Sequence, residues 1–365
     1  MSGKKCVFVT GGAGYIGSHT VVDLLQSGFD VVAIDNFANS VNGNNDEAVS
    51  LERVEKITGQ KATFYKCDLL DKQHLKSIFS QHRIDCVIHF AAMKAVGESM
   101  KAPLLYYKNN VVGTIHLLEV MKSHHIFNLV FSSSCCVYGT PHYLPIKEDH
   151  PTGHVTNVYG RTKYLIEEML SDLCNAEKEW NIISLRYFNP VGAHPSGLIG
   201  EDPTKPFTNL MPYIAQVAIG RKPLLTIFGG DYDTKDGTGV RDYIHVMDLA
   251  SGHVAALNKL FVGQLNYKVY NLGTGKGITV LELVSAFEKA SGHKVPYKIE
   301  PRRLGDITSM YADSSLAEKE LNWKATYDLD KMCEDFWHWQ SSNPDGYRTA
   351  NRNGTSCNGD TNGGH

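Results

Sequence analysis

Tyr159 and Lys163 are the residues whose types and spacing most directly suggest chemistry. In a helix, a spacing of four places both side chains on one face, about one turn apart. A free tyrosine has a pKa near 10, so ionising it near neutral pH requires roughly 4 kcal/mol at about 1.4 kcal/mol per unit. An ammonium group about 4 Å away supplies about this much at an effective dielectric constant near 20. The pair therefore predicts a tyrosine that acts as a general base.

The same spacing of Tyr and Lys recurs at residues 143–147 and 327–331. Pro145 interrupts the helical register of the first, and we interpret the second as a surface coincidence near the C-terminal helix. Only Tyr159 follows a predicted strand and opens an amphipathic helix. The alternative for this pair is a half-buried tyrosine beside a solvated lysine.

Ser134 precedes Tyr159 by 25 residues and is the third catalytic candidate. Its hydroxyl can bind a substrate hydroxyl or relay the proton of that group, and the alternative is a serine of a turn or helix cap. The 16 histidines show no metal-ligand spacing, and the sequence has no His-Glu-x-x-His. No metal site is therefore predicted.

A glycine loop near the N-terminus predicts a dinucleotide site. A predicted strand over 5–10 is followed by the loop 11–17, a helix to Ser27 and a strand over 30–35 that ends at Asp35. Glycines allow a pyrophosphate to approach the backbone at the helix start, and Asp35 can accept hydrogen bonds from a ribose diol. The absence of a nearby Arg favours NAD over NADP. The alternative is an ordinary strand-to-helix turn.

Strands and helices alternate through the first half of the chain. Further strands are predicted over 62–67, 85–90 and 128–132, with helices over 46–58, 71–81 and 102–123 and after Tyr159. This alternation is typical of an α/β fold of the Rossmann type, a doubly wound parallel sheet. Ser132 to Ser134 then lie at the carboxyl end of a strand, where such sheets bind ligands. Helix 102–123 can pack on the sheet or on a second subunit.

The composition predicts two domains and a tail. We expect an NAD-binding Rossmann domain over 1–189 and a smaller α/β substrate domain over 190–343, parts of which can return to the first. Residues 344–365 are rich in Asn, Gly, Ser and Thr and are predicted to be disordered.

The charge balance and the cysteine positions limit the kinds of binding partner that we expect. Lys and Arg number 36 against 39 Asp and Glu, so no broad basic field for nucleic acid is expected. The eight cysteines form no Cys-x-x-Cys pair, which argues against a disulfide framework or structural zinc. The chain contains no apolar run long enough for a membrane span and enters a strand without a signal-like segment. We therefore expect a cytoplasmic protein that binds no membrane.

The motifs together resemble those of the extended short-chain dehydrogenase/reductase superfamily. The resemblance is carried by the loop 11–17, the segment 132–139 and the segment 159–163. Further segments resemble the UDP-galactose 4-epimerase family within it, and these are residues 94–99, 187–190, 192–197, 209–213 and 239–246. The similarity extends over roughly residues 4 to 340.

This resemblance implies a tightly bound NAD, a UDP-hexose substrate and a homodimer joined through helix 102–123 and the helix after Tyr159. The implied cofactor contacts are Gly11, Gly12, Ala13, Gly14, Tyr15, Ile16, Gly17, Asp35, Asn36, Phe37, Asn39, Ser40, Asp68, Leu69, Phe90, Lys94, Tyr159, Lys163 and Tyr187. The implied substrate contacts are Ser134, Tyr187, Phe188, Asn189, Thr208, Asn209, Leu210, Thr226, Phe228, Arg241, Arg303 and Asp306.

The implied activity is the interconversion of UDP-galactose and UDP-glucose in galactose metabolism. Tyr159 takes the O4 proton while NAD removes hydride from C4, and the 4-keto sugar turns over before the hydride returns. A turning sugar must be held loosely, so binding should concentrate on the UDP part, with Arg241 and Arg303 on its phosphates. For either arginine the alternative is a surface salt bridge.

Several positions depart from the family pattern, namely Ala92, Cys135, Cys136, Thr208, Thr226 and Leu304. Met310 stands where the family gates the space around the sugar 2-substituent, so acceptance of N-acetylated UDP-sugars stays open. One alternative function is a nucleotide-sugar 4,6-dehydratase, whose acid and base positions are here Cys135 and Cys136. The other is a catalytically inactive NAD-binding regulator.

Overall fold

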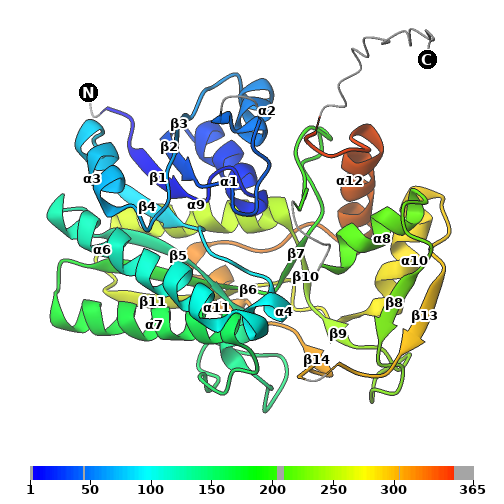
Figure 1. Ribbon diagram of the computed structural model, residues 1–365. Coiled ribbons are helices and arrows are strands. Elements are labelled where there is room, and N and C mark those ends of the chain that lie inside the picture. Colours follow the sequence, from blue (N-terminus) through cyan, green and yellow to red (C-terminus); the bar gives the residue numbers. More distant parts are fainter. Residues whose placement is uncertain (1–2, 44–45, 204–208, 304, 349–365) are drawn as a thin grey trace, which may run out of the picture.

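Seven parallel strands form the central sheet of the computed structural model, which describes residues 3–43, 46–203, 209–303 and 305–348 (Figure 1). In spatial order they are β11 (Tyr267–Leu272), β6 (Asn181–Tyr187), β5 (Asn128–Ser134), β4 (Cys86–His89), β1 (Cys6–Thr10), β2 (Asp30–Asp35) and β3 (Thr63–Lys66). The order reverses between β1 and β4, where Thr10 pairs with both Ile34 and His89. This strand order confirms the predicted Rossmann-type fold. Doubly wound sheets bind their ligands at such a reversal.

Helices cover both faces of the sheet, which explains its continuous apolar strands. One face carries α1 (Tyr15–Gln26), α2 (Val49–Thr58), α9 (Val246–Val262) and α11 (Ser315–Leu321). The other carries α3 (Lys72–Gln81), α6 (Gly113–Ser123) and α7 (Val158–Ala176). Strand β1 alternates between the two cores, since Val7 and Val9 pack on the first face and Phe8 on the second.

The helix predicted over 102–123 contains a π-helical segment. It consists of α5 (Pro103–Tyr106), η2 (Tyr107–Val112) and α6, and α4 (Val96–Lys101) precedes it. Asn110, in the π segment, is buried and its amide donates to the Thr162 hydroxyl at 3.0 Å. This bond joins the helix to α7, and π segments are frequent at functional sites.

A smaller α/β region with a core of its own lies beside the sheet. Its helices are α8 (Leu210–Ala218), α10 (Val280–Ser291) and α12 (Leu329–Ser342), and its paired strands are β8 (Leu225–Phe228) and β13 (Tyr297–Glu300). Short strands β7 (Asn189–Val191), β9 (Val240–Arg241), β10 (Tyr243–His245), β12 (Ile278–Thr279) and β14 (Ser309–Met310) complete it. Met211, Ile227, Phe287 and Phe336 lie in its core.

The chain returns to the sheet after it has entered this smaller region. Strand β11 pairs along β6, and α9 and α11 cover the first face, so the sheet includes residues well beyond 189. The predicted start of the tail, at residue 344, is earlier than the structure shows. Tyr347 is buried against Trp339, and its N–H donates to the Asp202 carboxylate at 2.7 Å. The remainder of that predicted tail, 349–365, lies outside the described residues.

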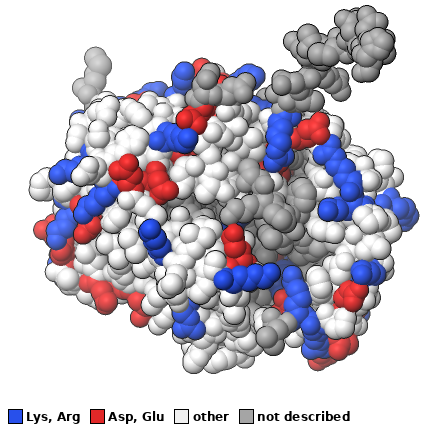
Figure 2. Space-filling model, viewed as in Figure 1, with Lys and Arg blue, Asp and Glu red and all other residues white. Residues whose placement is uncertain are grey.

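In the described ranges, no helix has both the length and the apolar character needed to cross a membrane. Basic and acidic side chains are interspersed over the face drawn in Figure 2. That pattern agrees with the nearly even charge balance of the sequence.

Candidate active site

A cavity of about 740 Å³ opens at the carboxyl ends of the strands, between the sheet and the smaller region. Its wall includes the glycine loop, the ends of β2, β4, β5 and β6, and the start of α7. Asn209 and Pro212 contribute from the other side. The volume lies within the usual range for small-molecule sites.

The glycine loop leaves its backbone open to a ligand. Gly11 has a φ of +69°, and a Cβ on Gly17 would lie 2.2 Å from the Gly11 carbonyl oxygen. Side chains at these positions would therefore displace the turn. Gly14 is the N-cap of α1 and brings no side chain to the first amides of that helix. This cradle fits the pyrophosphate of a dinucleotide, which favours the positive end of a helix.

Asp35 is buried at the end of β2, and the protein already occupies most of its carboxylate. One oxygen accepts from Ala13 N–H at 3.2 Å, and the other accepts from Phe37 N–H at 2.8 Å and the Ser40 hydroxyl at 2.9 Å. Burial raises the pKa of Asp35, and these hydrogen bonds oppose the shift. A carboxylate has about four acceptor positions, so about one remains for a ribose hydroxyl rather than the two of a diol.

The structure brings most of the predicted cofactor residues together. The wall includes Gly11, Ala13, Gly14, Tyr15, Ile16, Gly17, Asp35, Asn36, Asn39, Ser40, Asp68, Leu69, Phe90, Lys94, Tyr159, Lys163 and Tyr187. Gly12 and Phe37 are not in this wall. Gly12 faces the Ala33 side chain, and the Phe37 ring packs on Phe64 with centroids 5.6 Å apart.

Tyr159, Lys163 and Ser134 share one wall of the cavity. Asn157 caps α7 by accepting from Gly160 N–H at 2.7 Å, which fixes the first turn of the helix on which Tyr159 lies. Ser134 ends β5, and its hydroxyl forms a hydrogen bond with the Tyr159 phenol. The predicted catalytic residues are thus neighbours in space.

The expected lowering of the Tyr159 pKa by Lys163 is not present in the protein alone. Burial raises the pKa of Tyr159, Cys136 adds to the shift, and the Ser134 hydrogen bond opposes it. Lys163 donates to the Ser132 carbonyl oxygen at 2.5 Å. Burial lowers the pKa of Lys163 to about 7, so this lysine is a weaker source of positive charge than a solvated one.

Glu167 is a buried charge beneath this wall that sequence reasoning missed. Its carboxylate accepts from Arg186 Nη2 at 2.6 Å and from the Ser133 hydroxyl, and it opposes the lowering of the Lys163 pKa. The sequence did contain a signal for this residue, because Glu167 follows Lys163 by four positions. That spacing places Glu167 on the same face of the helix as Lys163, where a charged side chain must be buried. Glu201 was missed too, and it binds Lys94 at 3.0 Å and Asn209 at 2.6 Å within the cavity.

The predicted substrate residues are only partly assembled. Ser134, Tyr187, Phe188, Asn189 and Asn209 line the cavity, and Thr208 lies outside the described residues, as does Leu304. The cavity wall that the described residues form does not include Leu210, Thr226, Phe228, Arg241, Arg303 or Asp306.

Arg303 is engaged at the surface instead of facing the cavity. Its Nε lies 2.9 Å from the Asp306 carboxylate, and its guanidinium lies 4.8 Å from the centre of the Phe228 ring. Arg241 donates to the Val240 carbonyl oxygen at 2.8 Å, and its charge lowers the pKa of Cys136. The two arginines therefore differ in how close they come to the catalytic wall.

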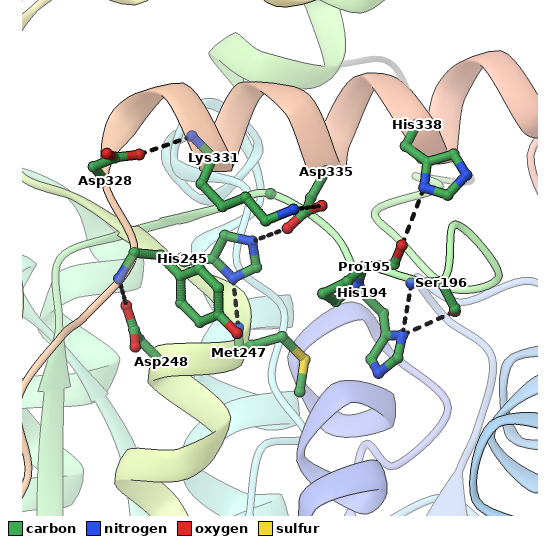
Figure 3. A network of polar contacts seen from close by, with 12 residues as sticks. His194, Pro195, Ser196, His245, Met247, Asp248, Asp328, Lys331, Asp335 and His338 are labelled. Carbon is green, nitrogen blue, oxygen red and sulfur yellow. Dashed lines mark hydrogen bonds and ion pairs between the residues drawn. The ribbon is translucent and has the colours of Figure 1, made fainter.

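The Tyr and Lys at 327 and 331 are not part of the cavity wall, and they contact His245 and Asp335 instead. Figure 3 shows Lys331 and His245 both reaching Asp335 of α12, at 2.7 and 3.2 Å. The Tyr327 ring stacks on His245 with centroids 4.3 Å apart. These contacts hold α12 against the end of β10, away from the cavity wall.

Comparison with known proteins finds relatives along nearly the whole chain. A family model described as GDP-mannose 4,6 dehydratase matches residues 8–336. UDP-glucose 4-epimerase of Bos taurus is 58% identical over 94% of this chain and 98% of its own. The Drosophila melanogaster UDP-glucose 4-epimerase is 56% identical over 93% and 98%. The structure of Bifidobacterium longum UDP-glucose 4-epimerase with NAD+ and UDP has a TM-score of 0.89 and 52% identity, covering 94% of this chain and 100% of that one.

Proposed function

Because this chain belongs to the UDP-glucose 4-epimerase family, we propose that its cavity holds NAD and a UDP-hexose and that Tyr159, Ser134 and Lys163 serve the reaction there. The reaction interconverts UDP-galactose and UDP-glucose. The observation that supports these roles most strongly is that the three side chains share a wall with the glycine loop. A proton acceptor thus stands within the same cavity as the cradle for a dinucleotide.

The residues present fit NAD. The loop 11–17 offers open backbone for the pyrophosphate, Asp35 keeps about one acceptor position, and Asn36 and Asp68 lie beside it. When bound, NAD supplies the hydride acceptor and donor for C4 of the sugar, and its oxidised ring carries a positive charge.

Tyr159 removes the proton from the sugar O4 and returns it to the same oxygen after the 4-keto sugar has turned over. The Ser134 hydroxyl binds the phenol oxygen and stabilises its charge as the proton leaves. Because burial raises the pKa of Tyr159, a positive charge has to lie near the phenol. At about 4 Å and an effective dielectric constant near 20, such a charge lowers the pKa by about three units.

The wall around Tyr159 suits a sugar that must turn. Cys135, Cys136 and Phe188 line the cavity beside it, and thiols and phenyl rings form weak hydrogen bonds or none. The side chains of Asn189 and Asn209 also line the cavity, and an amide can form strong hydrogen bonds with the UDP part. We therefore expect strong contacts to the nucleotide and weak ones to the hexose.

The dehydratase alternative is not favoured. Eight UDP-glucose 4-epimerases are 55–58% identical to this chain, and thiols replace the acid and base that a dehydratase places after the serine. An inactive regulator would have no need of Tyr159 and Lys163, which it would be free to lose.

We further propose a homodimer in the cytoplasm. Apolar side chains are exposed along α4 to α6 and on α7, and they are Val96, Met100, Leu104, Leu105, Val112, Ile115 and Leu165. Helix α7 packs against this segment, so the side chains gather on one side of the molecule, as at a subunit interface. The seven described cysteines are all free, which is usual in reducing compartments.

Tyr159→Phe tests the proposed base. The variant should lower the turnover of UDP-galactose, supplied without added NAD, by roughly 10²–10⁴-fold, since it removes the proton acceptor. NAD released by denaturation should remain at the wild-type level. Tyr143→Phe is the matched control, because Tyr143 belongs to the same sequence motif but is exposed outside the cavity. Equal turnover in Tyr159→Phe and wild type would refute the assignment.

A further inference from the structure

Two adjacent thiols, those of Cys135 and Cys136, stand in the wall of the cavity directly after Ser134. They form the start of the 3₁₀ helix η3 (Cys135–Tyr138). The two residues are consecutive and both line the cavity, and their thiols shift each other's pKa, upward for Cys135 and downward for Cys136. Neither thiol takes part in the proton or hydride transfer of the proposed reaction.

Cys136 is chemically distinct among the cysteines that the structure describes. The hydrogen bond from Cys135, another with Ser134 and the charge of Arg241 lower the pKa of Cys136 to about 7 against the effect of burial. Burial raises the pKa of the other five cysteines outside the pair, Cys6, Cys67, Cys86, Cys174 and Cys333. Thiolates are the nucleophilic form, and Cys136 is half-buried at the cavity surface.

The pair is better suited to a bridging ligand than to a disulfide. Consecutive Cα atoms are about 3.8 Å apart, whereas disulfides usually join Cα atoms about 4.4–6.8 Å apart. A larger atom bound between the two sulfurs avoids this constraint, because each sulfur then bonds to the ligand instead of to its neighbour.

We propose that Cys135 and Cys136 form a dithiol site for a thiophilic ligand of the trivalent arsenical class. With an organoarsenic oxide, both S–H bonds break and two As–S bonds form. The arsenic oxygen leaves as water with the two thiol protons, so no oxidant or reductant is consumed. The site lies inside the substrate half of the cavity.

Occupation of this site blocks UDP-hexose binding, a consequence that rests on the proposed function. On the protein side, Cys135 packs in a cluster with Val137 and Met310, which do not line the cavity, and Met310 is 4% exposed. A ligand on the two sulfurs therefore extends into the cavity, toward Ser134 and Tyr159. UDP-hexose and the arsenical should exclude one another.

Phenylarsine oxide on the purified, NAD-containing full chain tests the site. We expect one adduct by intact mass, located by peptide mapping at Cys135 and Cys136, with loss of epimerase activity. A dithiol such as 2,3-dimercaptopropanol should restore activity, and an equal thiol concentration of 2-mercaptoethanol should not. UDP should slow the reaction.

Single variants separate a bidentate site from one reactive thiol. Linked contacts gain roughly 10²–10⁴-fold in apparent affinity, so Cys135→Ala and Cys136→Ser should each weaken reagent binding by roughly 100-fold or more. Cys6→Ser is the matched control, since Cys6 is also half-buried but is not in the cavity wall, and it should behave as wild type.

Mass mapping on the wild type keeps the test valid if a variant misfolds. An adduct elsewhere, reversal by the monothiol, or unchanged binding in both variants would overturn the dithiol site. An adduct at the pair with unchanged turnover would overturn its place in the substrate half. The role of Tyr159 is judged separately, by its own variant.

Discussion

At the scale of single residues, the ammonium of Lys163 is held where burial opposes its charge. The pKa of this lysine falls from 10.5 in the unfolded chain to about 7 in the folded protein. Between these values the unfolded chain binds more protons, so the free energy of unfolding rises with pH. Below pH 7 both states are protonated, and the full cost of burying the charge is present.

Lys163→Met should remove this pH dependence. In NAD-free protein, the unfolding free energy of the wild type relative to the variant should rise between about pH 7 and pH 10, by up to about 1.4 kcal/mol per unit. Urea unfolding at several pH values measures the difference. Parallel pH curves for the two proteins would show that Lys163 is not buried as a weakened base.

Glu167 forms a buried ion pair with Arg186, in which both side chains are at most 7% exposed. Glu167→Gln leaves a buried guanidinium without its counter-charge, which typically costs about 3–5 kcal/mol. Glu168→Gln changes the next residue, which is exposed, and should shift stability by less than about 0.5 kcal/mol. Denaturant titration measures the stability of the two variants. Equal stabilities would show that the Arg186 charge does not depend on the Glu167 carboxylate.

At the scale of elements, the turn from β1 to α1 depends on Gly17. A methyl group there would meet the Gly11 carbonyl oxygen at 2.2 Å, so Gly17→Ala should displace the loop. We expect the purified variant to carry much less NAD, measured by absorbance after denaturation. Gly263→Ala is the control, because no atom lies within 4 Å of its added Cβ. Full NAD content in Gly17→Ala would contradict the assigned role of this turn.

Local sequence patterns predicted the elements that follow local rules. Strand β2 was predicted at its observed bounds, 30–35, and α3 within one residue, since Asp71 caps it by accepting from His74 N–H at 3.0 Å. The π segment was not predictable, because a tertiary bond from Asn110 to Thr162 accompanies it. Tyr347 was assigned to a tail because its burial depends on Trp339 and Asp202 rather than on neighbours in sequence.

The site was predictable where a motif carried it. Ser134, Tyr159 and Lys163 do share a wall of the cavity. The rise in the Tyr159 pKa could not be predicted from the sequence, because it comes from burial in the assembled cavity. The buried partners Glu167 and Glu201 were missed because their counter-charges come from distant parts of the chain, Arg186 and Lys94.

At the scale of the whole molecule, the proposed dimer depends on the apolar surface of α4 to α7. Leu104 is 81% exposed within it, so Leu104→Glu places a charge where the partner should pack and should shift the species in solution toward the monomer. Val262→Glu is the control at 81% exposure on the end of α9, outside that surface. Light scattering measures the mass, and a dimer in both variants would place the interface elsewhere.

The route of the chain also bears on its synthesis by the ribosome. Strand β11 pairs with β6 but follows it by some eighty residues, most of which build the smaller region. A nascent chain that has emerged only to residue 200 therefore has six strands of the sheet and an unpaired edge along β6, which invites association with other chains. Fragments cut after residue 189 should behave as aggregating intermediates, whereas the full chain closes that edge itself.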